Sequence, residues 1–150
     1  MAIAISPITS LSNLAFMAIG QEAAQPRSKG AINRGTVLSS DLEVRGAIEL
    51  ALGCERLLAV QPGQDAIAAI TTWLKANPSD ELNLVAHGAP GQIALGGGID
   101  RAGLLERAEL LASWGVKQIN LWSCRVGADQ AFIATLEELS GARVVASVLP

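Results

Sequence analysis

Two residues with the chemistry of a catalytic pair follow apolar runs in different parts of the chain. The first run, residues 82–86, leads into His87, which is the only histidine, and the second, residues 119–123, leads into Cys124. A thiolate is a strong nucleophile, and an imidazole can carry a proton. Together they could attack a carbonyl carbon and release an amine, provided that the fold brings them to one place.

Each residue also has a purely structural explanation. A cysteine at the end of a buried strand is often a small core residue, and a single histidine in apolar surroundings is often only structural. The matching positions of His87 and Cys124 favour catalysis. Cys54 gives the contrast, because it precedes an apolar run. We expect it at the opposite edge of the sheet, too far from Cys124 for a disulfide, and interpret it as structural.

The elements that would position the pair alternate regularly. Apolar runs typical of strands occur at residues 36–39, 56–60, 81–86, 117–123 and 143–148, and residues 92–95 are a candidate hairpin strand. Helical spacing of apolar residues predicts helices at 41–52, 64–76, 101–114 and 129–140. Strands that alternate with helices predict βαβ units and a parallel sheet.

These patterns predict an α/β fold, a three-layer sandwich with a mostly parallel sheet of about five strands. The strands read as continuous apolar runs, which is typical of strands that helices cover on both faces. Residues 1–34 lack this alternation and are interpreted as an N-terminal extension and linker, and residues 35–150 as the α/β domain. Ligands of such sheets bind beyond the carboxyl ends of the strands, where His87 and Cys124 would lie.

The neighbours of the pair extend the predicted site. Gly88 would let the backbone approach a substrate, and the N–H groups of Gly88 and Cys124 are candidates for an oxyanion hole. The helix predicted after Cys124 would favour the thiolate through its dipole, although the loop at residues 125–127 separates the two. Trp122 is interpreted either as a core residue or as the wall of a specificity pocket.

The composition excludes several classes of protein. Half of the residues are hydrophobic and 17% are charged, which is too apolar for a disordered chain. A net charge of −3 and 3% aromatic residues argue against a nucleic-acid partner. We expect no metal and no cofactor, because the histidine lacks ligand spacing around it and the glycines 96–98 lack a phosphate-loop lysine. Asp65, Asp100 and Asp129 are interpreted as helix caps or as solvated charges.

The N-terminal segment predicts no membrane span, because polar residues interrupt its apolar stretches. A secretory signal is poorly supported, since the first basic residue is Arg27 and a charged start is missing. The compartment therefore stays open, with the cytoplasm as the default.

The runs that end in His-Gly and in Cys resemble those of the caspase-like cysteine peptidases, which include caspases, legumain, gingipains and clostripain. Residues 84–96 are similar, more specifically, to an uncharacterised bacterial caspase-like domain found near the start of very large adhesin-type surface proteins. The similarity continues through Trp114-Gly115, Cys124 and residues 140–142. It covers residues 36–148, and by this analogy the protein would be secreted.

The resemblance implies a cysteine endopeptidase with Cys124 as the nucleophile and His87 as the general acid and base. Its substrate would be a peptide or protein, and its own linker near Arg27, Lys29 or Arg34 is one such target. Ser39, Ser40 and Ser147 would flank the pocket for the residue before the cleaved bond. No charged residue stands at an obvious pocket position, so the resemblance carries over no preference for Asp, Asn or Arg.

Two alternatives remain open at the level of the sequence. Family members usually continue with further strands after the point that corresponds to Pro150, so a partner or second copy would complete the groove. Without one, the domain would be a binding or assembly module that keeps His87 and Cys124 idle. A flavodoxin-like ligand-binding domain is the weaker alternative, because only Ser39, Ser40 and Asp41 stand where its phosphate loop would be.

Overall fold

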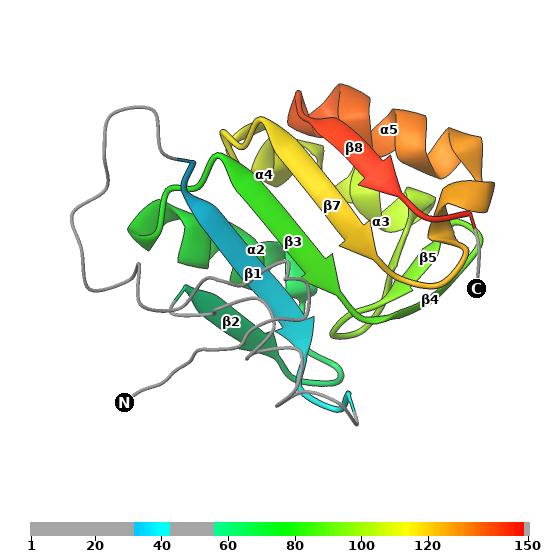
Figure 1. Cartoon of the computed structure of the whole chain (residues 1–150), viewed down its shortest axis with the longest axis horizontal. Coiled ribbons are helices and arrows are strands. Elements are labelled where there is room, and N and C mark those ends of the chain that lie inside the picture. The colour runs from blue at the N-terminus through cyan, green and yellow to red at the C-terminus, as the bar shows by residue number, and fades with distance from the viewer. Residues whose placement is uncertain (1–31, 43–55, 149–150) are drawn as a thin grey trace. The chain divides into compact units, whose positions relative to one another are not determined.

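A five-stranded sheet organises the part of the chain that the structure, a computed structural model, describes, namely residues 32–42 and 56–148 (Figure 1). Its strands are β1 (Arg34–Ser39), β2 (Leu57–Val60), β3 (Glu81–Val85), β7 (Gln118–Trp122) and β8 (Arg143–Ala146), in the order β2-β1-β3-β7-β8. The pairs β1–β3, β3–β7 and β7–β8 are parallel. The predicted α/β sandwich with a mostly parallel sheet is confirmed. Apart from Arg56 and Leu57, the described residues form one compact unit.

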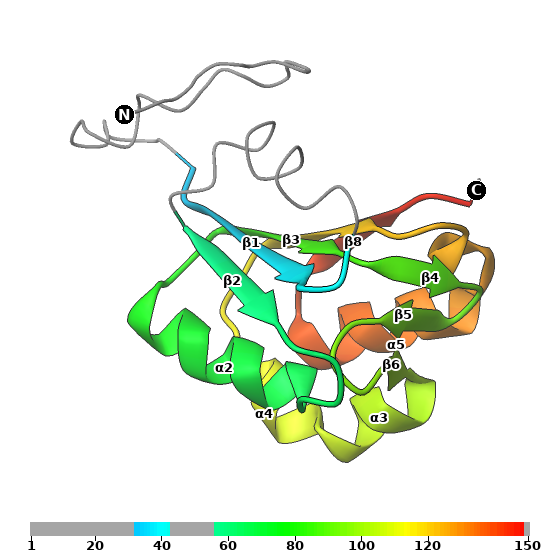
Figure 2. The ribbon, with the colours of Figure 1, turned by 90° about the horizontal axis from the view of Figure 1, so that it is seen from below.

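The described α-helices lie against one face of this sheet (Figure 2). They are α2 (Ala66–Ala76), α3 (Arg101–Glu106), α4 (Ala108–Ala112) and α5 (Gln130–Ser140). The side chains of Asp65, Asp100 and Asp129 accept hydrogen bonds from the N–H groups that open α2, α3 and α5, at 3.1, 2.8 and 3.1 Å, so the predicted caps are confirmed. The helix predicted at residues 41–52 and nearly all of the predicted N-terminal extension lie outside the described residues.

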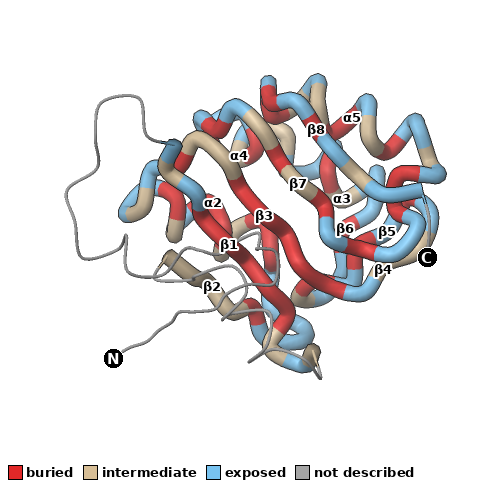
Figure 3. The backbone as a smooth tube through the Cα atoms, viewed as in Figure 1, coloured by how far each residue is buried: buried red, intermediate tan, exposed pale blue. Residues whose placement is uncertain are grey.

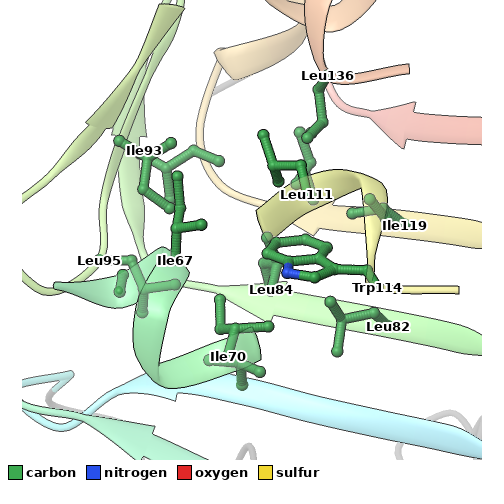
Figure 4. Close-up of a cluster of buried hydrophobic side chains, with 14 of the residues drawn as sticks. Ile67, Ile70, Leu82, Leu84, Ile93, Leu95, Leu111, Trp114, Ile119 and Leu136 are labelled. Atoms are coloured by element: carbon green, nitrogen blue, oxygen red, sulfur yellow. The ribbon is translucent and has the colours of Figure 1, made fainter. Parts of the chain in front are cut away.

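The core fills the space between the sheet and these helices (Figure 4). Leu82, Leu84 and Ile119 of the sheet pack with side chains of α2, α4 and α5, and all of them belong to one buried cluster. Trp114 is buried two residues after α4, and its indole N–H donates to Thr71 Oγ1 of α2 at 2.9 Å. Each large apolar side chain buried in this way contributes about 1.5–3 kcal/mol, which holds the strands that carry the site.

The opposite face of the sheet is partly polar, and this corrects one prediction. Along β3 and β7 the side chains alternate, so Asn83 and Asn120 lie on the face away from α2–α5, and Figure 3 shows the matching alternation of burial in β7. The amide of Asn120 donates to Asn83 Oδ1 at 3.0 Å, and Gln118 donates to Asn120 Oδ1 at 2.8 Å. The prediction of continuously apolar strands is therefore wrong for β3 and β7.

A second, smaller sheet follows β3 directly. It consists of β4 (His87–Ala89), β5 (Gln92–Ala94) and β6 (Ile99–Asp100), paired antiparallel in that order. The predicted strand at 92–95 is confirmed as β5, whereas β4 and β6 were not predicted. Gly91 has a φ of +70°, as the third position of a Pro-Gly type II turn requires. The single helix predicted at 101–114 is two short helices that meet at Arg107.

Candidate functional site

His87 and Cys124 emerge at equal heights on neighbouring strands. Val85 of β3 and Trp122 of β7 are the last paired residues, and His87 and Cys124 each follow two positions later. The Ala86 N–H still donates to the Trp122 carbonyl at 3.4 Å, so the two chains remain side by side beyond the sheet. Paired strands lie about 4.8 Å apart. The sequence places both residues at the carboxyl edge, and they would meet there only if their strands were neighbours; the pairing of β3 with β7 fulfils that condition.

The chains touch closely at this point. A methyl group on Gly88 would lie 2.8 Å from the Cβ of Ser123 and 3.2 Å from the carbonyl oxygen of Cys124, so only glycine fits without displacement. Ser123 is buried, and it faces Gly88 on the core side. His87 and Cys124, the neighbours of Gly88 and Ser123 in the chain, are both exposed.

Two backbone N–H groups are available beside the cysteine. In a hairpin with a two-residue turn, the flanking pair Ala89–Gln92 is hydrogen-bonded and the pairs then alternate, so Gly88 opposes Ile93 without mutual hydrogen bonds. Its N–H therefore points away from β5. No acceptor within the described residues takes the N–H of Cys124. Backbone N–H groups in such a position beside a thiol are of the type that forms oxyanion holes.

The turn after Cys124 is unusual in its backbone. Arg125 has a φ of 59°, the only positive φ of a non-glycine residue in the described segments. This left-handed conformation costs about 1–2 kcal/mol, and such strain gathers at functional sites. The N–H of Gly127 donates to the Ser147 carbonyl at 2.9 Å, and Gln130 Nε2 donates to the Gly127 carbonyl at 2.9 Å. The cysteine turn is thus fastened to the end of β8 and to the start of α5.

The dipole of α5 does not reach the cysteine as the sequence suggested. A short 3₁₀ turn, Val126–Ala128, follows Arg125, and α5 starts only at Gln130. The Asp129 carboxylate already caps its first turn. Because a helix dipole acts within about one turn of its end, its effect on Cys124 is small.

The structure separates the four residues predicted to flank a pocket. The Ser39 hydroxyl is buried and donates to the Asp41 carboxylate, and Ser40 Oγ donates to Gln61 Oε1 at 3.1 Å. These bonds turn the end of β1 toward β2, and β3 lies between β1 and Cys124. Ser147 and Trp122, in contrast, adjoin the cysteine turn, one through its carbonyl and the other through the chain.

Trp122 is the residue whose position the sequence left open between core and pocket. Its side chain is on the face away from α2–α5 and 58% exposed, so it is not a core residue. Its indole N–H donates to Oδ1 of the buried Asn83 at 3.0 Å. An exposed ring held by a buried partner keeps one orientation beside the cysteine.

A hollow of about 400 Å³ lies beside His87. The residues of β4 and β5 and the glycines 96–98 line it, and His87 is its only titratable lining residue. Sequence reasoning missed Ala89, Gln92 and Ala94 of this lining. The Pro90-Gly91 turn between two short runs was the signal that could have placed them.

Neither metal ligation nor membrane insertion is indicated by the part of the chain that the structure covers. Its described residues contain no cluster of three His, Cys, Asp or Glu side chains that could hold a metal ion. None of the described helices is long and apolar enough to cross a membrane.

Fold and site together define an α/β sandwich protein with a histidine and a cysteine at adjacent strand ends of a parallel sheet. Residues 41–149 match the family described as Domain of unknown function (DUF4347), and the chain belongs to this family. A comparison with curated proteins finds no match. The match covers His87, Cys124 and every strand of the sheet except β1.

Proposed function

We propose that this protein is a caspase-like cysteine endopeptidase that uses Cys124 and His87. One observation carries the proposal: the β3–β7 register brings the two residues to the same height on neighbouring strands, with both side chains exposed. Close contact between Gly88 and the Cys124 carbonyl supports it, because it holds the two strand ends in a fixed relation.

The chemistry assigned to each group follows from this arrangement. His87 takes the thiol proton, and the Cys124 sulfur bonds to the carbonyl carbon while the C=O electron pair moves onto oxygen. The N–H groups of Gly88 and Cys124 stabilise that oxyanion. The C=O bond then re-forms, the C–N bond breaks, and the imidazolium gives its proton to the leaving amine.

Hydrolysis of the acyl-enzyme uses the same groups. His87 removes a proton from a water molecule, the resulting hydroxide attacks the thioester, and the carboxylic product leaves as the sulfur regains its proton. Within the described residues, no hydrogen bond joins the side chains of His87 and Cys124. This suits a histidine that mainly serves the leaving amine, as the caspase-like resemblance implies.

Labelling by a peptidyl acyloxymethyl ketone, followed by mass spectrometry, tests the dyad. We expect one label on Cys124, none in Cys124→Ala, and unchanged labelling in Cys54→Ala, the matched variant at the other cysteine. His87→Gln should lower the labelling rate and any peptidase turnover by about 10²–10⁴-fold. Equal labelling of Cys54 and Cys124, or no dependence on His87, would contradict the proposal.

Self-processing is part of the same proposal, and the position of Arg34 reduces the number of candidate cleavage sites. Arg34 lies within β1, and its guanidinium pairs with Glu81 at 3.2 Å, so cleavage there would have to pull out a central strand. The remaining candidates, Arg27 and Lys29, lie outside the described residues. Incubated wild-type protein should show a new N-terminus after one of these two residues, and Cys124→Ala should keep the original one.

A binding or assembly module is the second candidate function, and one observation favours it. Exposed apolar residues, Trp122 and Val145, lie on β7 and on the edge strand β8. A homo-oligomer could bury them. Light scattering that shows a dimer in wild type and a monomer in Val145→Asp, with no thiol reactivity toward peptidyl probes, would support this function instead.

A further inference from the structure

Exposed apolar residues gather at one end of the large sheet. Among the described residues the large hydrophobic side chains that are exposed are Ile32, Leu105, Trp122, Val145 and Val148. Three of these five belong to β7, to β8 and to the residues just after β8, next to the cysteine turn. Trp122 has the highest exposure, 58%, and it is also the one whose side chain a buried hydrogen-bond partner fixes.

Trp122 and Cys124 are both exposed beside the end of β7, and the residue between them, Ser123, is buried. Trp122 is therefore separated from the thiol by a single residue of the chain and shares the solvent-accessible edge with it. Val145 lies on the same face of the sheet as Trp122, because it pairs with Asn120, whose amide bonds Asn83 on that face.

The position of His87 decides which part of a substrate would meet Trp122. The strand order β3-β7-β8 places His87 on one side of Cys124 and Val145 on the other. A leaving amine must lie toward His87, which protonates it, so the hollow beside His87 is on the leaving-group side. The acyl part of the substrate then lies over β7 and β8, where Trp122 and Val145 are found.

We infer that Trp122, together with Val145, selects substrates with a large apolar side chain on the residue whose carbonyl Cys124 attacks. This inference rests on the proposed peptidase function and names its substrate class. The neighbours of Trp122 on this face are Asn83 and Val85 of β3 and Val145 of β8, none of which is charged. A surface of this composition offers apolar contact to a substrate side chain.

The hydrogen bond that anchors the indole explains why Trp122 would discriminate between substrate side chains better than another apolar residue would. The hydrogen bond from Trp122 Nε1 to Asn83 Oδ1 holds the ring in place before substrate binds, at 3.0 Å. A ring already fixed loses little conformational freedom on binding, so its contact area contributes more fully to selection. Trp122→Phe keeps an aromatic ring but loses that hydrogen bond.

A set of peptidyl acyloxymethyl ketones that differ only in the residue beside the reactive group tests this. With wild type we expect the second-order rate of Cys124 labelling to be about 10-fold or more higher for Phe and Leu than for Gly, Asp or Arg. Trp122→Ala should remove about 10-fold from the Phe rate and leave the Gly rate and the iodoacetamide rate unchanged. Trp122→Phe should lie between wild type and Trp122→Ala.

Leu105→Ala is the matched control, because Leu105 is a 50% exposed apolar residue on α3, on the opposite side of the sheet. It should leave all rates unchanged. If Cys124 is labelled but Asp is the preferred residue, selection belongs to a cation such as Arg125 and the inference fails while the peptidase survives. If none of these probes labels Cys124 although iodoacetamide does, the proposed function fails, and the inference with it.

Discussion

The two faces of the central sheet are built on different principles. The face toward α2–α5 is apolar and packed, with Leu82, Leu84 and Ile119 buried to 1% exposure or less. The other face has a short chain of amide hydrogen bonds through Asn83, and Trp122 is exposed beside it. Stability resides mainly in the first face, and the second holds chemical groups in fixed positions near the cysteine. Substitutions on the two faces should therefore differ in size and in kind.

Phe132→Ala should have the largest effect, on the packed side. Phe132 is fully buried in α5, and its removal leaves a cavity next to the sheet. We expect a loss of about 3–5 kcal/mol in the free energy of unfolding, measured by urea denaturation. Val145→Ala on the other face should cost less than about 1 kcal/mol. Similar losses for the two variants would end the distinction between the faces.

Asn83→Ala should have the next largest effect, because it acts on the polar side through hydrogen bonds. It removes the acceptor of both Asn120 and Trp122, and we expect a loss of about 1–3 kcal/mol. The double variant with Trp122→Phe should lose less than the sum of the single losses, since Phe has no N–H to leave unpaired. Strict additivity in urea denaturation would show that the indole hydrogen bond contributes nothing.

Gly88→Ala tests the close contact between the chain segments that follow β3 and β7. Its new methyl group would lie 2.8 Å from the Ser123 Cβ, and we expect a loss of about 1–2 kcal/mol together with slower thiol labelling. Adding Ser123→Gly removes the clashing atom and should restore part of the stability. No rescue in the double variant would mean that the two strand ends are further apart than this contact implies.

Ser123→Ala should have the smallest effect, and of opposite sign. The Ser123 hydroxyl is buried without a hydrogen-bond partner, so its removal leaves no partner unsatisfied. We expect stability to stay unchanged or to rise by up to about 1 kcal/mol in thermal unfolding. Ser140→Ala is the matched control, because that buried hydroxyl donates to the Leu136 carbonyl at 2.6 Å. A clear loss in Ser123→Ala would point to a partner for this hydroxyl.

Most of the parallel sheet could be predicted because its strands are separated by helices with regular apolar spacing. The edge position of His87 and Cys124 followed from the same pattern, since each ends an apolar run. The small sheet was harder: β4 and β6 have only three and two residues, too few for a periodic signal. The sequence therefore places His87 at the end of a strand, whereas it begins β4.

The orientation of Trp122 was also within reach of the sequence, but only in part. The polar-apolar alternation of Gln118-Ile119-Asn120-Leu121 places Trp122 on the polar face of β7. Its hydrogen bond to Asn83 depends on the β3–β7 register, which joins residues 39 positions apart. Such a pairing is set by packing of the whole sheet and leaves no local signal. The left-handed backbone of Arg125 could not be predicted from the local sequence either, because arginine has no preference for that conformation.

The hydrogen bond between Gly127 and the Ser147 carbonyl has a consequence for how the protein is made. Ribosomes deliver a chain from its N-terminus, at about 5–20 residues per second. His87 and Cys124 are therefore both synthesised before the strand that fastens the cysteine turn. A nascent chain that has not yet reached β8 already contains Cys124 and His87. It still lacks the Ser147 carbonyl that holds the turn between Cys124 and α5. Fixing of the cysteine turn in its folded position thus waits for the synthesis of β8 and Ser147.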